Sequence, residues 1–353
     1  MLKNKWASTA LMVVAPACAW AQSGVTVYGR LDVGVESVKI SPVASAPGST
    51  TAKFVNDTSF WGIRGTEDLG SGLNAYFKLE SGINPGTGTS TIANSMFSRE
   101  SYIGVGSRQY GNVQIGGQFA PAVAVTGKLD PFQRGTNGLI QNLMQSSAGN
   151  RNRGFLAHVD NAVQYISPVL GGFTGRALYS FSEKTVEPRD VGRIAAASVE
   201  YARGPFFGAV SFEQSKVASV PAGGSWSNNT VTAGATYDFV FLKVYGLLLR
   251  NTLTNNEDST GAMAGLTVPL GNGTVRTSYA TRKVENTAGS RAGVFALGYT
   301  YDLSKRTMLY TSYARLTNGA ASNFALWPSS KGFGLPAAGQ DVRSIEMGIR
   351  HFF

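Results

Sequence analysis

Apolar and polar side chains alternate with a period of two along most of this chain. In the first such stretch the apolar positions are Val25, Val27, Leu31, Val33 and Val35, and the polar positions between them are Thr26, Tyr28, Arg30, Asp32 and Glu36. A period of two predicts β-strands with two different faces. Alternation alone leaves open whether the strands form a soluble sandwich, with its polar sides outside, or a barrel with a wet interior.

The composition argues against a soluble globular domain. Charged residues make up 15% of the 353 residues, against about 25% in typical soluble domains. The most apolar region, 233–249, is interrupted by Asp238 and Lys243, whereas a membrane-spanning helix needs roughly 20 apolar residues. Because lipid tolerates no unpaired backbone groups, a membrane protein without such helices must be a closed barrel.

The spacing of the strands predicts a single barrel domain over 22–353. The strand-like segments number sixteen, at 24–38, 57–67, 72–82, 97–107, 111–119, 162–168, 172–182, 192–203, 206–216, 229–239, 241–251, 260–269, 273–283, 292–302, 306–316 and 341–353. Short links such as 203–205 alternate with long ones such as 41–56, 85–96 and 317–340. Alternately short and long connections are typical of an all-β transmembrane antiparallel barrel of the outer-membrane type.

The N-terminus predicts export. Lys3 and Lys5 precede an apolar stretch over 7–19, and Ala19-Trp20-Ala21 supplies small residues for cleavage. We therefore expect residues 1–21 to be a cleaved signal peptide. Cys18, the only cysteine, would leave with it, so the mature chain is expected to lack disulfides.

Several motifs resemble one family. The stretches 25–32 (VTVYGRLD) and 60–70 (FWGIRGTEDLG) are similar to the first two strands of the trimeric porins of β-proteobacteria, and 299–307 (YTYDLSKRT) with 348–353 (GIRHFF) are similar to its last strands. The resemblance covers essentially the whole mature chain. It implies a homotrimeric general diffusion porin of the Gram-negative outer membrane, in contact with membrane lipid and lipopolysaccharide. It also implies passive transport of small hydrophilic solutes, and a terminal Phe353 recognised by the outer-membrane assembly machinery.

The segment 120–161 is the longest without alternation, and loops of that length are usually functional. The resemblance implies a third extracellular loop that folds into the barrel, while an extracellular flap is the alternative. The loop is net basic, with Lys128, Arg134, Arg151 and Arg153 against Asp130 and Asp160.

Alternation predicts which charges face the lumen. The inward basic residues are Arg30, Arg64, Lys78, Arg176, Arg276 and Arg350, and the inward acidic residues are Asp32, Glu36, Glu80, Glu100, Glu200 and Glu346. We expect Arg30, Arg64 and Lys78 to form the constriction with Lys128 and Arg134, faced by Asp130, and to give a mild anion preference. Alternatively, these charges are merely solvated in a wide lumen.

Two further positions carry expectations. Arg99 lies on the outward parity near the rim, which predicts a subunit or headgroup contact rather than a place in the pore. Gly117 follows Val113-Gln114-Ile115-Gly116, where the resembled family usually has a pore-facing arginine. The constriction is therefore expected to be wider or less basic than in relatives.

Other classes of function find little support in the sequence. After the signal peptide only His158 and His351 remain as histidines, with no cysteine and no HExxH motif, so no catalytic residue, metal or cofactor is expected. Basic residues are scattered rather than clustered, which argues against nucleic-acid binding. A substrate-specific channel for a sugar or an organic anion remains the alternative, with Tyr28, Tyr76 and Tyr102 on the inward parity.

Overall fold

The computed structural model describes residues 24–145, 154–219, 223–254, 258–326 and 334–353. The expected signal peptide over 1–21 lies outside them. The strands are β1 Gly24–Ile40, β2 Ser49–Asn56, β3 Phe60–Gly70, β4 Leu73–Asn84, β5 Thr89–Ser90, β6 Glu100–Ser107, β7 Gly111–Phe119, β8 His158–Ile166, β9 Phe173–Ser180, β10 Ile194–Arg203, β11 Phe206–Ala218, β12 Ser225–Asp238, β13 Lys243–Leu253, β14 Ser259–Leu270, β15 Gly273–Val284, β16 Ala292–Asp302, β17 Thr307–Asn318 and β18 Val342–Phe352; the helices are α1 Pro121–Leu129 and α2 Gln141–Met144. Among the described residues, no helix has the length and apolar character needed to cross a membrane.

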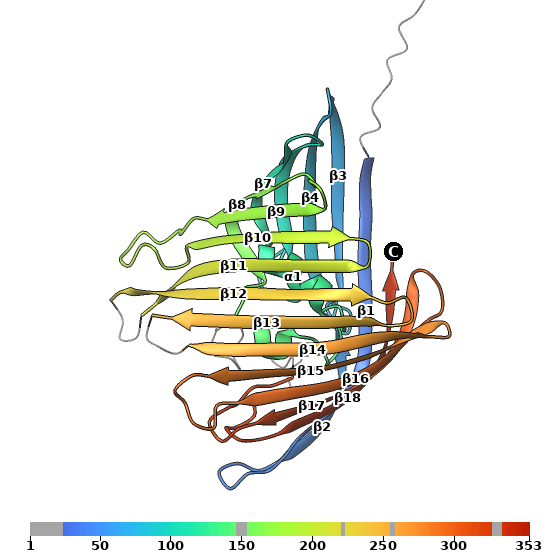
Figure 1. Ribbon diagram of the computed structural model, residues 1–353, viewed down its shortest axis with the longest axis vertical. Coiled ribbons are helices and arrows are strands. Elements are labelled where there is room, and N and C mark those ends of the chain that lie inside the picture. The colour runs from blue at the N-terminus through green and yellow to red at the C-terminus, as the bar shows by residue number, and fades with distance from the viewer. Residues whose placement is uncertain (1–23, 146–153, 220–222, 255–257, 327–333) are drawn as a thin grey trace, which may run out of the picture.

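The strands close into one antiparallel ring of sixteen, which confirms the predicted fold (Figure 1). Closure is made by β1 and β18, which pair from Arg30 opposite Phe352 to Ile40 opposite Val342. Both β2 and β3 pair with β1 along successive stretches, so together they fill one position in the wall. The two-residue β5 pairs with β4 outside the ring. A closed ring leaves no exposed strand edge.

Two boundaries differ from those predicted. The sequence predicts a loop over 41–56, yet Ser49–Asn56 forms β2 and extends the pairing of β1 as far as Ile40. Most residues of β2 are polar or small, so apolar and polar side chains alternate only weakly along it. The backbone pairing with β1 is what sets its position. Strand β8 begins at His158 rather than at 162, because an irregularity between Gly116 and Gln118 shifts its register with β7.

Burial is inverted relative to a soluble protein. Large apolar side chains on one parity of the strands are exposed, as in Val27 at 62% and Ile103 at 65%, whereas charged side chains on the other parity, such as Asp32 and Glu346, are both 0% exposed. The apolar face therefore points out of the ring and the ionic face points into it. Together with closure, this excludes the sandwich and matches a barrel whose outer face meets lipid.

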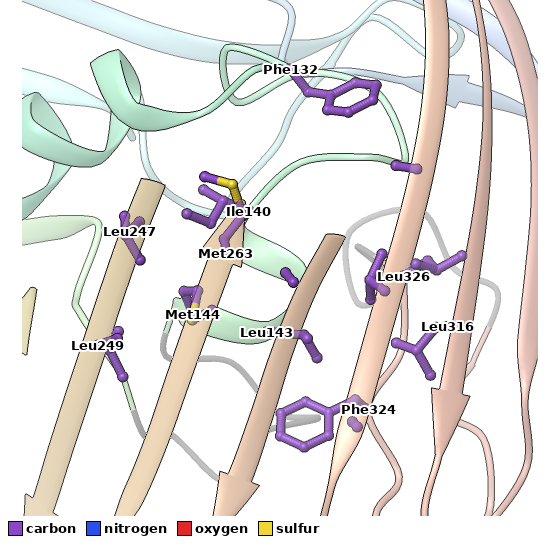
Figure 2. Packing of buried hydrophobic residues seen from close by; sticks show 14 of the residues in the cluster. Phe132, Ile140, Leu143, Met144, Leu247, Leu249, Met263, Leu316, Phe324 and Leu326 are labelled. Atoms are coloured by element: carbon purple, nitrogen blue, oxygen red, sulfur yellow. The ribbon is translucent and has the colours of Figure 1, made fainter. Parts of the chain in front are cut away.

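The long connection between β7 and β8 contains α1 and α2. Helix α1 packs against β10, β11, β12 and β13, behind which it is visible in Figure 1. Figure 2 shows apolar side chains of this connection, among them Ile140, Leu143 and Met144, facing those of the wall strands. We call the described residues 120–145 and 154–157 the internal loop, since their side chains and backbone contact the inward-facing side of the wall.

Candidate pore constriction

A cavity of about 630 Å³ lies between the internal loop and the wall formed by β1, β2 and β4. Three arginines line it: Arg30 from β1, Arg99 just before β6, and Arg134 from the internal loop. The rest of its lining consists of hydroxyl, amide, small and apolar side chains, namely Asn56, Thr58, Ser59, Gly82, Asn84, Thr91, Ile92, Ser98, Phe119, Val123, Gln133, Gln145 and Ala157. Among the described residues, no carboxylate lines this cavity.

Arg30 is positioned by the break between β2 and β3. Its Nη2 donates to the carbonyl oxygens of Thr58 at 2.9 Å and Asp57 at 3.2 Å. Asp32 lies 3.7 Å from its Nε. These two carbonyls lie between β2 and β3 and take no part in strand pairing, so they are free to orient the guanidinium. The break between the two strands therefore sets the position of this positive charge.

Arg99 corrects one expectation from the sequence. It does not face outward: its Nε lies 2.5 Å from Glu80 Oε1, and its guanidinium stacks over the rings of Phe60 and Phe119, at 4.6 and 5.2 Å from their centroids. The residue precedes β6, which begins at Glu100, so the alternation of that strand does not apply to it. Arg99 is therefore a lumenal cation.

Arg134 brings the third cation from the internal loop. Its Nη2 donates to Gln145 Oε1 at 3.1 Å, and its guanidinium lies over the ring of Phe155. No ion pair to its guanidinium occurs among the described residues. Burial lowers the pKa of Arg134 to about 10, and the positive charges of Arg99 and Arg30 act in the same direction. At neutral pH the group is still protonated.

Asp130 does not face Arg30, Arg64 or Lys78. Its carboxylate is buried within the internal loop, where it accepts hydrogen bonds from the backbone nitrogens of Phe132 at 2.9 Å, Arg134 at 3.0 Å and Ile140 at 3.2 Å. Burial, the larger influence, raises the pKa of the carboxyl, and these donors oppose the rise. Asp130 therefore holds the fold of the loop, including the left-handed backbone of Arg134 (φ 58°), and supplies no acidic face to the cavity.

Several inward charges anchor the loop to the wall. Arg276 Nη1 donates to the carbonyl of Pro131 at 2.6 Å, and Glu346 Oε2 accepts from the backbone nitrogen of Asn137 at 2.9 Å. The remaining anchors join Asp57 to Thr136, Arg282 to Leu143 and Glu213 to Leu156. These wall residues come from β11, β15 and β18 and from the break after β2, so the loop is fastened at separate points around the ring.

Other predicted site residues lie on the inward face but away from the cavity. Arg350 Nε pairs with Asp32 Oδ2 at 2.7 Å, while Lys78 pairs with Glu100 and lies 3.4 Å from Glu80. In the pairing of β1 with β3, Arg64 stands opposite Thr26 and Arg30 stands opposite Phe60. Arg64 is therefore four residues, or roughly 13 Å, away from the level of Arg30, toward the short turns. Arg176 and Lys128 both pair with Glu200. Arg151 and Arg153 lie outside the described residues.

Comparison with known proteins identifies the family of this barrel. The family described as Gram-negative porins matches residues 7–321. The chain belongs to that family. It is an outer-membrane porin, and its fold and family point to a channel rather than an enzyme.

Similar proteins agree with this assignment. The porin is 32% identical to outer membrane porin protein 32 of Delftia acidovorans over 97% of each chain. It is 30% identical to an outer membrane porin protein of Bordetella pertussis over the whole of both chains. Among solved structures, the anion-selective porin from Comamonas acidovorans superposes with a TM-score of 0.80 at 29% identity, covering 94% of this chain and 100% of that one. OmpT of Vibrio cholerae, at 14% identity and a TM-score of 0.69, shares the fold.

Alternation misses the apolar part of this porin's interior. Inward-facing Leu247, Leu249, Met263 and Leu316 are buried against the internal loop (Figure 2). The sequence does indicate this apolar interior in Val244–Leu249, where both faces of the strand are largely apolar. A strand with two apolar faces is buried on both sides.

Proposed function

We propose that this porin is an anion-preferring general diffusion channel whose constriction is the cavity lined by Arg30, Arg99 and Arg134. One observation carries the proposal: three guanidinium groups converge on a single cavity that no carboxylate of the described residues lines. A small hydrophilic anion entering it meets only positive charges, hydroxyls and amides among its polar contacts. A cation meets the same charges as a barrier.

The internal loop is the element that narrows the channel under this proposal. It carries Arg134 into the lumen, and the anchors on β11, β15 and β18 hold it there. The expected alternative, an extracellular flap, would not need hydrogen bonds to inward-facing wall residues such as Glu346 and Arg276. The loop contacts therefore support the inward course.

The size of the preference follows from Coulomb's law. A unit charge about 8 Å from a passing ion in water contributes about 0.5 kcal/mol, with opposite signs for chloride and potassium, so one uncompensated charge changes the ratio of their permeabilities by about 1 kcal/mol, roughly fivefold. Asp32 and Glu80 neutralise part of the field of Arg30 and Arg99, so the three arginines together are expected to contribute about 1.5 kcal/mol to the ratio, roughly tenfold. The preference is expected to weaken as salt rises, because exposed charges are screened.

Zero-current potentials across planar bilayers in a KCl gradient test the proposal. The wild type is expected to favour chloride, and the triple variant Arg30→Gln, Arg99→Gln, Arg134→Gln is expected to lose roughly tenfold in the chloride-to-potassium ratio. Arg176→Gln is the matched control, since Arg176 faces the lumen but pairs with Glu200 away from the cavity. A cation-selective wild type, or equal losses in the triple variant and the control, would refute the proposal.

A substrate-specific channel for a sugar or an organic anion is the second candidate. Tyr76 and Tyr102 lie edge to face with ring centroids 6.2 Å apart, and Tyr28 donates to Glu80 at 2.9 Å. These inward rings form a short aromatic surface below the arginines. Liposome swelling with sugars of graded size separates the two candidates: a general porin gives a size cutoff, and a specific channel saturates with one solute.

We further propose that the porin is a homotrimer and that Phe353 serves assembly. One solved structure of OmpT is described as a trimer form. Phe353 closes the ring by exchanging backbone hydrogen bonds with Gly29, at 3.1 and 3.2 Å, and its side chain is exposed. A gel band of trimer mass before boiling, converted to a monomer band by heat, tests the homotrimer. Slower insertion into the membrane of a variant lacking Phe353 tests the role of this residue in assembly.

A further inference from the structure

A second cavity, of about 430 Å³, lies next to the arginine-lined one. Its lining includes Lys128, Asp130, Gln133, Phe207, Lys243 and Tyr245, and we call it the lysine chamber. Gln133 lines both cavities. The arginine-lined cavity reaches Asn84 and Ser98, beside the long connection between β4 and β6. Phe207 and Lys243 instead follow short turns, so a solute coming from the long loops meets the lysine chamber after the arginines.

The chamber sets two ammonium groups over two aromatic rings. Lys128 Nζ lies 5.0 Å from the centroid of the Phe207 ring. Lys243 Nζ lies 5.4 Å from the centroid of the Tyr245 ring. The two aromatic residues stand at one level of the wall, because Thr236 of β12 is opposite both of them. With one strand between them, their backbones are about 10 Å apart.

The ammonium groups have few carboxylates to neutralise them. Glu200 pairs with Lys128 at 2.5 Å, but it also pairs with Arg176. Lys243 stands opposite Asp238 in the pairing of β12 with β13. Within the described part of the chain, however, Lys243 has neither an ion pair nor a side-chain hydrogen bond. The chamber therefore keeps a positive charge that an anion can use.

The acidic residue of the lining is already occupied. Asp130 accepts hydrogen bonds from the backbone nitrogens of Phe132 and Arg134 through different oxygens. It is 2% exposed, so it offers a passing solute little surface. The groups that a solute can reach are thus mainly the two ammonium groups, the two rings and the amide of Gln133.

The size and the lining of the chamber suit an organic anion better than chloride. Pockets of about 300–1,000 Å³ that combine aromatic walls with a few polar groups are typical of sites for small organic molecules. A carboxylate that accepts from either ammonium lies beside the ring that this ammonium covers. The rest of the solute then lies along that ring, where an aromatic body gains edge-to-face or offset contacts.

We propose that the lysine chamber binds small aromatic carboxylates on their way through the channel. The carboxylate accepts hydrogen bonds from Lys128 and Lys243, and the ring of the solute packs against the aromatic side chains of the chamber. The inference rests on the chain being a porin. It does not rest on the proposed chloride preference of the arginine-lined cavity.

Block of the single-channel chloride current by benzoate in planar bilayers tests the proposal. With the wild type, the block is expected to saturate, at a half-blocking concentration roughly fivefold lower than that of acetate, which lacks the ring. Benzamide, which has the ring without the charge, should need roughly fivefold more than benzoate.

Two variants separate the parts of the chamber. Lys243→Gln is expected to weaken benzoate block roughly fivefold and to leave benzamide unchanged. Phe207→Leu, which keeps an apolar side chain but removes a ring, should weaken benzoate block by a similar factor and leave acetate unchanged. Lys78→Gln is the matched control, because Lys78 is a lumenal lysine that pairs with Glu100 and lines neither cavity.

A benzoate block that does not saturate, or that acetate matches, would overturn the proposal. So would equal weakening in Lys243→Gln and Lys78→Gln, since any lumenal charge would then suffice, or an unchanged block in Phe207→Leu. The triple variant Arg30→Gln, Arg99→Gln, Arg134→Gln keeps this test separate from that of the constriction. It is expected to keep the preference for benzoate over acetate, and loss of that preference would move the aromatic solute to the arginine-lined cavity.

Discussion

The interior of this barrel has two unlike halves. The half made by β1, β3, β4 and β18 carries ionic groups such as Arg30, Asp32 and Glu80, and its strands β1 and β4 border the cavity. The half made by β13 to β17 carries buried apolar side chains such as Leu247 and Val294, and the internal loop covers it. The loop is thus packed onto one side of the barrel, and the other side is left to water and ions.

The difference shows how a loop can hold a fixed position inside an aqueous lumen. Fully burying one Leu or Met side chain contributes about 1.5–3 kcal/mol, whereas ion pairs exposed to water contribute about 0–1 kcal/mol. Leu143 and Met144 of the loop are fully buried against the apolar half. Apolar packing therefore adds to the attachment that the hydrogen-bonded anchors make, and the ionic half is free to act on solutes.

A charge placed in the apolar half should have the largest effect. In Leu247→Asp a carboxylate would replace a side chain that is 2% exposed beneath the loop. We expect a loss of about 4 kcal/mol in the free energy of unfolding, because the buried charge has no partner. The loop would also be loosened, so the single-channel conductance should rise. Heat-dependent gel mobility and planar-bilayer recordings measure the two effects.

Thr26→Asp is the matched control for this substitution. It adds the same charge at an inward position of β1 in the ionic half, opposite Arg64, where a change within about 0.5 kcal/mol is expected. If both variants lost stability and gained conductance to the same extent, the two halves would not differ in the way described.

Loss of the anchor at Arg282 should have the second largest effect. This side chain is 1% exposed within the apolar half, and it donates to the carbonyl of Leu143 at 2.5 Å and to Ser259 Oγ at 2.9 Å. Arg282→Met is expected to cost about 2 kcal/mol, since the carbonyl loses a charged donor. Arg282→Lys should restore part of the loss. Urea unfolding in detergent measures it, and an unchanged midpoint for Arg282→Met would show that packing alone holds the loop.

How much of this architecture the sequence predicts depends on the contrast between the two faces of a strand. Where lipid is on one side and water on the other, alternation predicts strand and orientation, as in Val25 to Glu36. Where the internal loop covers the inner face, that face is apolar too, and Leu247 cannot be told from outward Leu248 by pattern. Strand β2 is missed because its alternation is weak.

The site is predicted in part for similar reasons. Arg30 lies in a strongly alternating strand, and Arg134 lies in the long segment without alternation, so the sequence places both in the lumen, and both line the cavity. Arg99 is missed because it precedes its strand, where parity has no meaning. The sequence pattern places Asp130 wrongly, opposite the wall arginines. The sequence does not show that backbone nitrogens of the same loop donate hydrogen bonds to its carboxylate.

Arg99 offers a smaller test, on the ionic side. Arg99→Gln should lower the chloride-to-potassium permeability ratio roughly twofold, as expected for a charge beside the ion path whose field Glu80 partly neutralises. Stability should fall by about 1 kcal/mol, because Glu80 keeps Lys78 and Tyr28 as partners and the site is partly wet. Zero-current potentials measure the first, and Arg176→Gln again serves as control. An unchanged ratio would remove Arg99 from the constriction.

The smallest effect is expected at Gly117, where the resembled family usually has an arginine. A Cβ at this position would lie 3.3 Å from Asp160 Oδ1 and 3.4 Å from His158 Nε2, which is tight but not prohibitive. In Gly117→Arg the new guanidinium would stand beside the Asp160 carboxylate, so most of its field would be neutralised. We expect the chloride preference to rise by less than roughly twofold. Gly117→Ser, which adds bulk without charge, is the control in the same bilayer measurement. A rise as large as that of a single uncompensated charge would mean that Asp160 does not shield this position, and the ionic half would then extend to β7.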